Sequence, residues 1–141
     1  MAAVIGNATA LNAVVSSSTA MAAVAASQTA MTAIVASPTA MTAIWRSNSA
    51  VAAVQKNTTA WKTFTGATSA VMGKTVAILA NLNPADYADM TAVAASQTAM
   101  AAVIGNATAL NAVVSSSTAM AAVAASQTAM AAVIGNATAL N

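Results

Sequence analysis

Residues 21–40 read MAAVAASQTA MTAIVASPTA, two consecutive ten-residue units of the form Met-x-Ala-Val-x-x-Ser-x-Thr-Ala. In the second unit Ser37 stands directly before Pro38. This pair favours the start of a helix, because Ser caps free N–H groups and Pro at the first helical position has no N–H to lose. The predicted helix runs from the eighth position of one unit to about the fifth position of the next. These twenty residues therefore predict one short capped helix per decapeptide.

The same unit recurs along most of the chain. Units begin at Met1, Leu11, Met21, Met31, Met41, Val51, Trp61 and Val71, and they resume after a break at Met90, Met100, Leu110, Met120, Met130 and Leu140. Residues 1–30 and 100–129 are identical. That shared block of three units is compatible with three units per structural turn, and equally with a copying event of natural or engineered origin. Self-similarity at a fixed period indicates a repeat architecture.

Other backbones suit the ten-residue period less well. On one continuous helix, ten residues fall about 80° short of three turns, so the Met column would wind around the rod. On a strand, the large residues at positions one and four would point to opposite faces. A β-solenoid stays as the weaker alternative, because the Thr and Val columns have strand propensity. Gly6-Asn7 supports the helical interpretation, with Gly in the left-handed conformation ending one helix and Asn capping the next.

The predicted helices are too short to be stable alone. Ala at position ten, the large residue at one, Ala at three and Val at four should form one apolar side that is buried by stacking. We therefore expect an all-α solenoid of short capped helices, one per repeat, in which the Ala columns permit close approach. A parallel homotrimeric fibre of the same helices is the alternative.

The array changes character between residues 45 and 89, which hold all four aromatic and all six charged side chains. Residues 68–82 are predicted to form a longer helix that ends at Asn81-Leu82-Asn83-Pro84, and a second longer helix should begin with Asn83 as N-cap. We expect three parts: a decapeptide array over 1–70, a divergent helical insert over 71–89 and a second array over 90–141.

Composition excludes several functional classes. The 141 residues contain no cysteine and no histidine, and only 4% are charged, with a net charge of +2. Thiol and imidazole catalysis and the usual zinc ligands are therefore absent. Too few cations and aromatics are present for a nucleic-acid surface. No apolar stretch approaches the ~18–20 residues of a spanning helix, so membrane insertion is not expected. We predict no catalytic residue, no metal and no cofactor.

The aromatic and charged segment supplies the only candidates for a binding site. Arg46 and Lys56 occupy the same column one unit apart and could form a small basic ridge for an anionic partner. Trp61 and Phe64 replace core residues of the repeat, whereas Trp45 stands in the variable fifth column. Trp45 is therefore the better candidate for an exposed contact. The speculative binding residues are Trp45, Arg46 and Lys56.

The units MAAVAASQTA and MTAIVASPTA, together with NTTAWKTF around Trp61, resemble the decapeptide repeats in tail-fibre and other virion proteins of tailed bacteriophages. The resemblance implies an extracellular virion part, a shaft or spacer that contacts copies of itself or other virion subunits. It carries over no catalytic residue. Two alternatives stay open: a module that recognises a host-surface ligand through residues 45–89, and an ice- or surface-binding array of the Thr column that includes Thr9, Thr19, Thr29 and Thr39.

Overall fold

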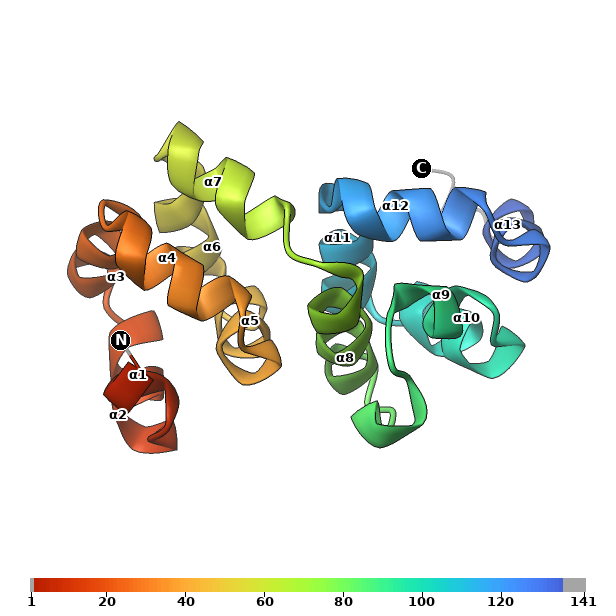
Figure 1. Ribbon diagram of the computed structural model, residues 1–141, viewed down its shortest axis with the longest axis horizontal. Helices are drawn as coiled ribbons and strands as arrows, with labels where there is room; N and C mark the ends of the chain where they lie inside the picture. Colours follow the sequence, from red (N-terminus) through yellow and green to blue (C-terminus); the bar gives the residue numbers. More distant parts are fainter. Residues whose placement is uncertain (1, 136–141) are drawn as a thin grey trace. The chain divides into compact units, whose positions relative to one another are not determined.

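The computed structural model describes residues 2–135 and is all-helical there, with no strand (Figure 1). The β-solenoid alternative is therefore wrong. The unit starts at Met1 and Leu140 lie outside the described residues. The chain divides into two compact units, Met1–Ala67 and Thr68–Asn141. This division falls near the boundary expected after residue 70 and groups the divergent segment with the second array.

The first unit consists of seven helices within its described residues. They are α1 (Ala2–Ile5), α2 (Ala8–Val15), α3 (Ser18–Ala25), α4 (Gln28–Val35), α5 (Pro38–Trp45), α6 (Asn48–Gln55) and α7 (Thr58–Thr65). From α2 onward each runs from position eight of one unit to position five of the next, as the sequence predicts.

The second unit begins with a longer helix and then returns to the short repeat. Its described elements are α8 (Ser69–Leu79), the 3-10 helix η1 (Pro84–Asp86), α9 (Met90–Ala94), α10 (Gln97–Ile104), α11 (Ala107–Ser115), α12 (Ser117–Ala124) and α13 (Gln127–Ile134).

The predicted caps are confirmed. Ser37 has an extended backbone, its Oγ accepts a hydrogen bond from the Ala40 N–H at 3.2 Å, and Pro38 is the first helical residue. The same bond to the third helical residue is made by Asn7, Ser17, Ser27, Ser47 and Asn57 in the first unit and by Ser96, Asn106, Ser116 and Ser126 in the second. Each cap satisfies one donor that the first helical turn leaves free.

The expectation that Gly ends these helices in the left-handed conformation is wrong. No described glycine has a positive φ, and the C-cap Gly105 lies at φ −77° like the C-cap Ala26 at −76°. One right-handed residue followed by one extended N-cap residue is enough to turn the chain by 95° between α2 and α3. Both conformations are open to every L-residue. The sixth position therefore accepts Ala, Ser, Arg and Lys as well as Gly.

The longer helix α8 is confirmed, with eleven residues that end slightly before the expected residue 82. Asn81 adopts φ +62°, and the N–H of Leu82 donates to the Ala77 carbonyl at 2.8 Å while the N–H of Asn81 donates to Ile78. These are the two bonds of a Schellman cap. The left-handed residue that stops a helix is thus an Asn in the divergent segment.

The second longer helix is not formed, which corrects that part of the prediction. Asn83 does cap, but the helical turn ends at Asp86, and Tyr87 is extended. The ammonium of Lys74 donates to the carbonyls of Pro84 at 3.1 Å and Tyr87 at 3.4 Å. Lys74 belongs to α8, so these two bonds hold residues 84–87 against α8. They also use carbonyls that a longer helix would bond internally. A new helix, α9, starts after the Asp89 cap.

Helices three places apart along the chain pack against each other in both units. In the first unit α2 contacts α5, α3 contacts α6 and α4 contacts α7, and in the second α8 contacts α11, α9 contacts α12 and α10 contacts α13. Cap side chains add contacts between helices four places apart. Ser47, the N-cap of α6, donates from Oγ to the Val15 carbonyl at the end of α2 at 3.0 Å, and Ser126, the N-cap of α13, donates from Oγ to the Ala94 carbonyl at the end of α9 at 2.7 Å. Capping and stacking therefore share residues.

Each helix carries two apolar faces. Positions ten and four, usually Ala and Val, lie about 40° apart on the helix and form what we call the Ala/Val face. Positions one and five form the Met face, about 100° further round. The interior helix α5 buries both, through Ala40 and Ile44 on the first and Met41 and Trp45 on the second. Position five therefore belongs to the buried side in addition to the predicted positions, while position three is buried at Ala53 and exposed at Ala13.

Candidate functional site

The aromatic side chains of the first unit form one cluster. The ring centroid of Trp45 lies 5.1 Å from that of Phe64 and 6.1 Å from that of Trp61, and the Trp61 and Phe64 centroids are 5.8 Å apart. Phe64 is fully buried and Trp61 is half-buried. Such separations suit tilted and edge-to-face packing. The cluster joins α5 to α7.

The expectation that Trp45 is an exposed contact is wrong, because the residue is only 7% exposed. Position five varies in residue type, but it lies on the Met face, so variability in that column does not by itself indicate an exposed residue. The indole N–H of Trp45 is buried without a hydrogen-bond partner among the described residues. Its ring is held by packing.

Arg46 and Lys56 are exposed, and each is the C-cap residue of its helix, α5 and α6 respectively. A cation at this place is favoured by the helix dipole. The two charges therefore have a local structural role in addition to any contact with a partner. Trp45 shares neither their exposure nor their surroundings, so the three predicted residues do not form one site.

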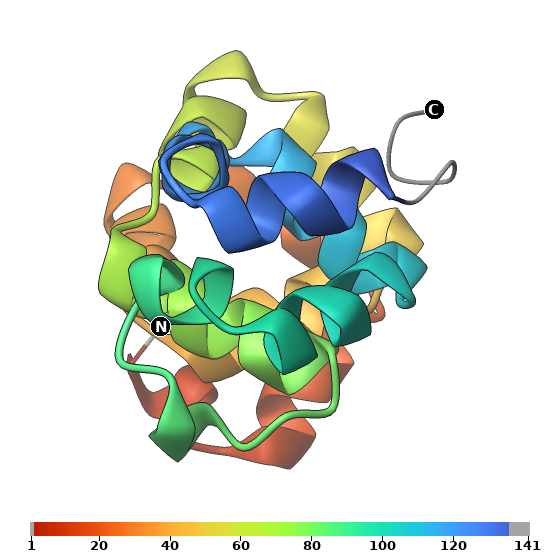
Figure 2. The ribbon, with the colours of Figure 1, turned by 90° about the vertical axis from the view of Figure 1, so that its right-hand side faces the viewer.

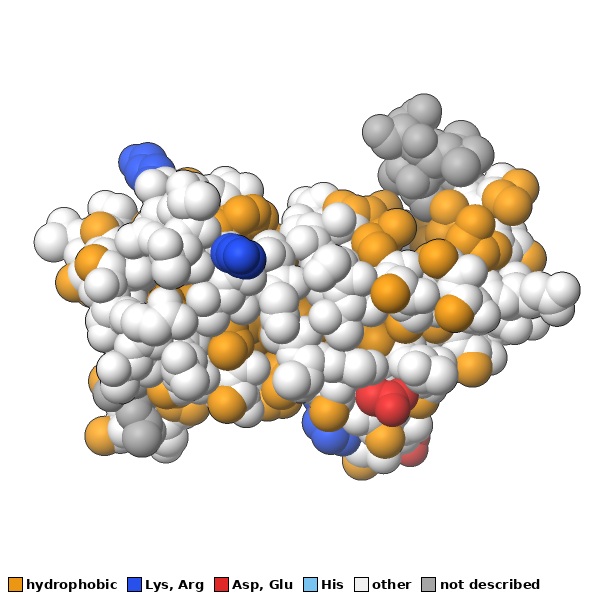
Figure 3. Space-filling view, turned by 45° about the horizontal axis from the view of Figure 1, so that its top comes forward, with side chains coloured by type: hydrophobic (Ala, Val, Ile, Leu, Met, Phe, Trp, Pro, Cys, Tyr) orange, Lys and Arg blue, Asp and Glu red, His pale blue; other side chains and the backbone are white. Residues whose placement is uncertain are grey.

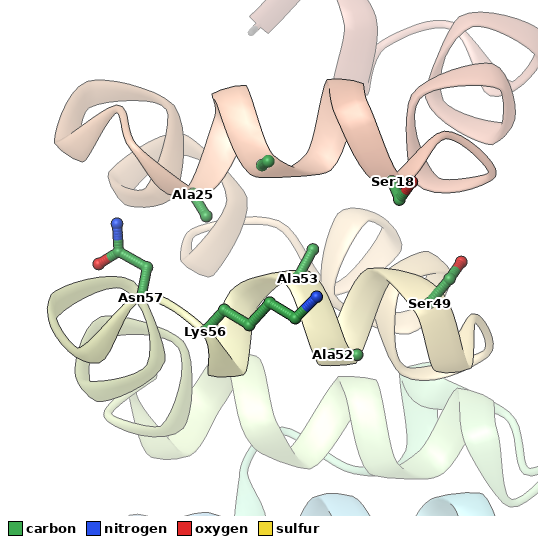
Figure 4. Close-up of a pocket in the computed structure, with 8 residues that line it drawn as sticks. Ser18, Ala25, Ser49, Ala52, Ala53, Lys56 and Asn57 are labelled. Carbon is green, nitrogen blue, oxygen red and sulfur yellow. The ribbon is translucent and has the colours of Figure 1, made fainter.

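Lys56 lies in an open groove of about 300 Å³ between α3 and α6 (Figure 4). Ala25 and Asn57 lie at one end of the groove and Ser18 and Ser49 at the other, with Lys56 extended along α6 between them. One ammonium, two hydroxyls and an amide could bind a small anionic or hydroxylated group. The walls are methyl groups of Ala, so the groove offers little else for specificity.

A second depression, in the second unit, was not foreseen from the sequence. It has a volume of about 130 Å³, and its apolar lining comes from α10 to α13 and includes Met100, Val113, Met120 and Met130. Large apolar side chains are exposed on the same helices: Val114 at 53%, Met120 at 40%, Met130 at 38% and Ile134 at 65%. Figure 3 shows hydrophobic side chains gathered on one face of the second unit. The sequence could not indicate this exposed apolar surface, because the equivalent residues of identical repeats are buried in other helices of the chain.

The described charged side chains are largely used by the fold. Asp89 caps α9, and Lys74 binds two carbonyls. Within residues 2–135 no three His, Cys, Asp or Glu side chains come close enough together to hold a metal ion. Over the same residues no single helix has both the length and the apolar character to cross a membrane; three pairs of successive helices meet that test jointly, each bent by 95–103°.

Comparison of the chain with protein-family models, with curated proteins and with solved structures finds no match. No family is assigned on that basis. The resemblance to the decapeptide repeats of phage tail-fibre proteins stays a prediction from the sequence.

Proposed function

We propose that the chain is a structural spacer, built as an α-solenoid with three short helices per turn and without catalytic activity. The observation that carries this proposal is the recurrent packing between helices three places apart, which occurs as three pairs in each unit. In an array of this kind each turn touches only its neighbours. Added repeats then increase length without altering any existing contact.

The burial pattern favours this arrangement over a homotrimeric fibre. In α5 both apolar faces are already covered within one chain, with Ala40 and Met41 fully buried and Ile44 only 1% exposed. Three chains wound together would instead need an apolar face left free along the whole array. The interior helices of the first unit leave none of that kind.

The finer proposal is a shaft or spacer of a phage tail, located in the virion and in contact with other virion subunits. Its support is the resemblance of units such as Met21–Ala30 and of the segment around Trp61 to decapeptide repeats of tail-fibre proteins. The scarcity of charge, 4% of residues, fits a part whose role is extension more than recognition.

A receptor-binding module is the second candidate, because Lys56 lies in a groove and Arg46 is exposed. The ice-binding alternative is less favoured. Thr9 and Thr19 are exposed, but they belong to α2 and α3, which are inclined by 95° to each other. A flat array of Thr side chains on successive helices is therefore not presented.

A cell-adsorption assay with the fluorescently labelled chain separates spacer from adhesin. We expect no saturable binding to bacterial cells of any candidate host. Saturable binding that is lost in Lys56→Glu, but retained in Lys62→Glu, would contradict the spacer proposal and support the binding module. Lys62 is the matched control because it is exposed on α7 and is absent from the groove.

A further inference from the structure

Identical helices at the two ends of the chain bury opposite faces. Residues 8–15 of α2 and 107–114 of α11 share the sequence ATALNAVV, and α3 and α12 share STAMAAVA. Near the N-terminus the Met face is buried: Val15 is 6% exposed and Met21 is fully buried. In the C-terminal copies the equivalent residues are open, with Val114 at 53% and Met120 at 40%.

The Ala/Val face shows the reverse. In the C-terminal copies Val113 and Val123 are each 3% exposed, and Ala112, which lies beside this face, is fully buried. The equivalent residues near the N-terminus are more open: Val14 is half-buried and Ala13 is exposed. Since the sequences are the same, the difference comes from which neighbour each helix has. The Met face receives the following turn, and the Ala/Val face rests on the preceding one.

A third pair of helices shows what the uncovered Met face accepts. α10 and α13 have the same sequence, QTAMAAVI, and they pack against each other, as the teal and blue helices facing the viewer in Figure 2 show. In α10 the Met face is covered, with Met100 1% and Ile104 7% exposed. In α13 the same residues, Met130 and Ile134, are 38% and 65% exposed. The Met face of α10 is thus covered in a structure where α10 packs against α13. The exposed Met face of α13 has the same residues and is open to a helix of the same kind.

We propose that the Met face of α11, α12 and α13 binds the first helices of a second copy of this chain, so that copies join head to tail. The inference rests on the proposed solenoid, and it names that solenoid's partner. The contact continues an interface already present between α10 and α13. Because the two surfaces are different and lie at opposite ends of the sequence, the contact is heterologous, and repeated contacts of this kind build either a ring or an open filament.

Two properties of the uncovered Met face support a second copy as the occupant. Met120 and Met130 belong to helices whose sequences recur in α3 and α10, where the equivalent Met21 and Met100 are buried by other helices of this chain. Residues 1–44 and 90–141 contain no charged side chain, so no charge repulsion opposes their association.

Sedimentation velocity of the full chain across a concentration series tests the proposal, with two blocking variants. Ala13→Lys places a charge on the open Ala/Val side of α2, and Val114→Lys places one on the open Met face of α11. We expect the unaltered chain to form species larger than a monomer as concentration rises. Each variant alone should sediment as a monomer, because all its copies have the same end blocked. An equimolar mixture should form a dimer and nothing larger, because the intact Met face of Ala13→Lys binds the intact first helices of Val114→Lys.

Ala26→Lys and Ala125→Lys are the matched controls, since both positions are exposed C-cap residues and Arg46 and Lys56 already occupy that column. They should associate like the unaltered chain. A chain that is monomeric at every concentration, association that persists in both blocking variants, or a mixture that fails to recover would each overturn head-to-tail docking. The spacer proposal would survive those results if the chain keeps its helical circular dichroism spectrum and does not adsorb to cells.

Discussion

At the scale of single residues, one side chain often serves both the helix and its neighbour. Ser47 accepts a hydrogen bond from the Ala50 N–H to cap α6 and also donates to the Val15 carbonyl at the end of α2. Ser27 makes the capping bond to Ala30 at the start of α4. Position one of the repeat contributes a core residue: Met31 is fully buried, whereas Ala26 at position six is exposed.

Replacing Ser47 by Ala should destabilise the fold more than replacing Ser27 by Ala. Loss of a helix cap costs about 0.5–2 kcal/mol, and Ser47→Ala also leaves a carbonyl that a hydrogen bond worth roughly 1 kcal/mol had satisfied. Urea unfolding followed by circular dichroism measures both changes. Equal losses in the two variants would show that the bond to Val15 contributes nothing.

Met31→Asp should unfold several helices around α4, whereas Ala26→Asp should lower the melting temperature only slightly, by the small cost of a negative charge at the C-terminal end of α3. The reason is that an uncompensated carboxylate in a buried apolar position is costly, while the same group at an exposed position stays hydrated. Thermal melts of the two variants provide the measurement. Similar melting temperatures would mean that the buried face is wrongly assigned.

At the scale of helices, the sequence predicted where the short helices begin and end, but not every feature of the segments between them. The caps and the helix limits follow from Ser, Asn and Pro at fixed positions, because capping is a local interaction between a side chain and the next turn. The burial of Trp45 and the early end of the turn at Asp86 depend on contacts outside the helix in question. Lys74 binding the Pro84 and Tyr87 carbonyls is one such contact, and no local pattern signals it.

Two glycines should respond in opposite ways to substitution by Ala. At Gly105 an added Cβ would lie 3.3 Å from the Ala101 carbonyl oxygen, with a backbone that Ala adopts at the same column, so Gly105→Ala should be neutral or stabilising by about 0.5–1 kcal/mol. At Gly73 an added Cβ would meet the backbone of Asp89 at 2.2 Å. Gly73→Ala should therefore separate α8 from α9 and lower stability strongly. Urea denaturation of both variants checks the opposite signs.

At the scale of the whole molecule, the same ten residues produce helices whose burial depends on their place in the chain. Because residues 1–30 and 100–129 are identical, the sequence alone could not show which face each of the two copies buries. Packing supplies that information: α2 and α3 contact the helix three places after them and bury the Met face, whereas α11 and α12 contact the helix three places before them and bury the Ala/Val face. Exposure in the second unit is thus a property of position in the array.

Removing residues 100–129 should leave a folded chain, because the new junction restores the sequence QTAMAAVI of α10 and keeps every cap in register. Removing only 100–104 should be more damaging despite its smaller size, since it puts Asn106 and the apolar faces out of register with the preceding helix. Helical circular dichroism and the free energy of unfolding of the two variants provide the test. A five-residue deletion as stable as the thirty-residue one would show that ten residues is not the structural period.

The distance between paired spin labels in the first unit tests the three-helix turn most directly, and a chain without cysteine allows clean labelling. Ala22 and Ala52, thirty residues apart, are exposed on opposite walls of the groove between α3 and α6. Helices in contact have axes about 8–10 Å apart. The Ala22→Cys/Ala52→Cys pair, diluted with unlabelled chain, should therefore give a shorter electron–electron distance than Ala22→Cys/Thr32→Cys or Ala22→Cys/Lys62→Cys. A distance near the ~45 Å of thirty residues on one continuous helix, or a pair ten residues apart that is closer than the pair thirty apart, would contradict the account.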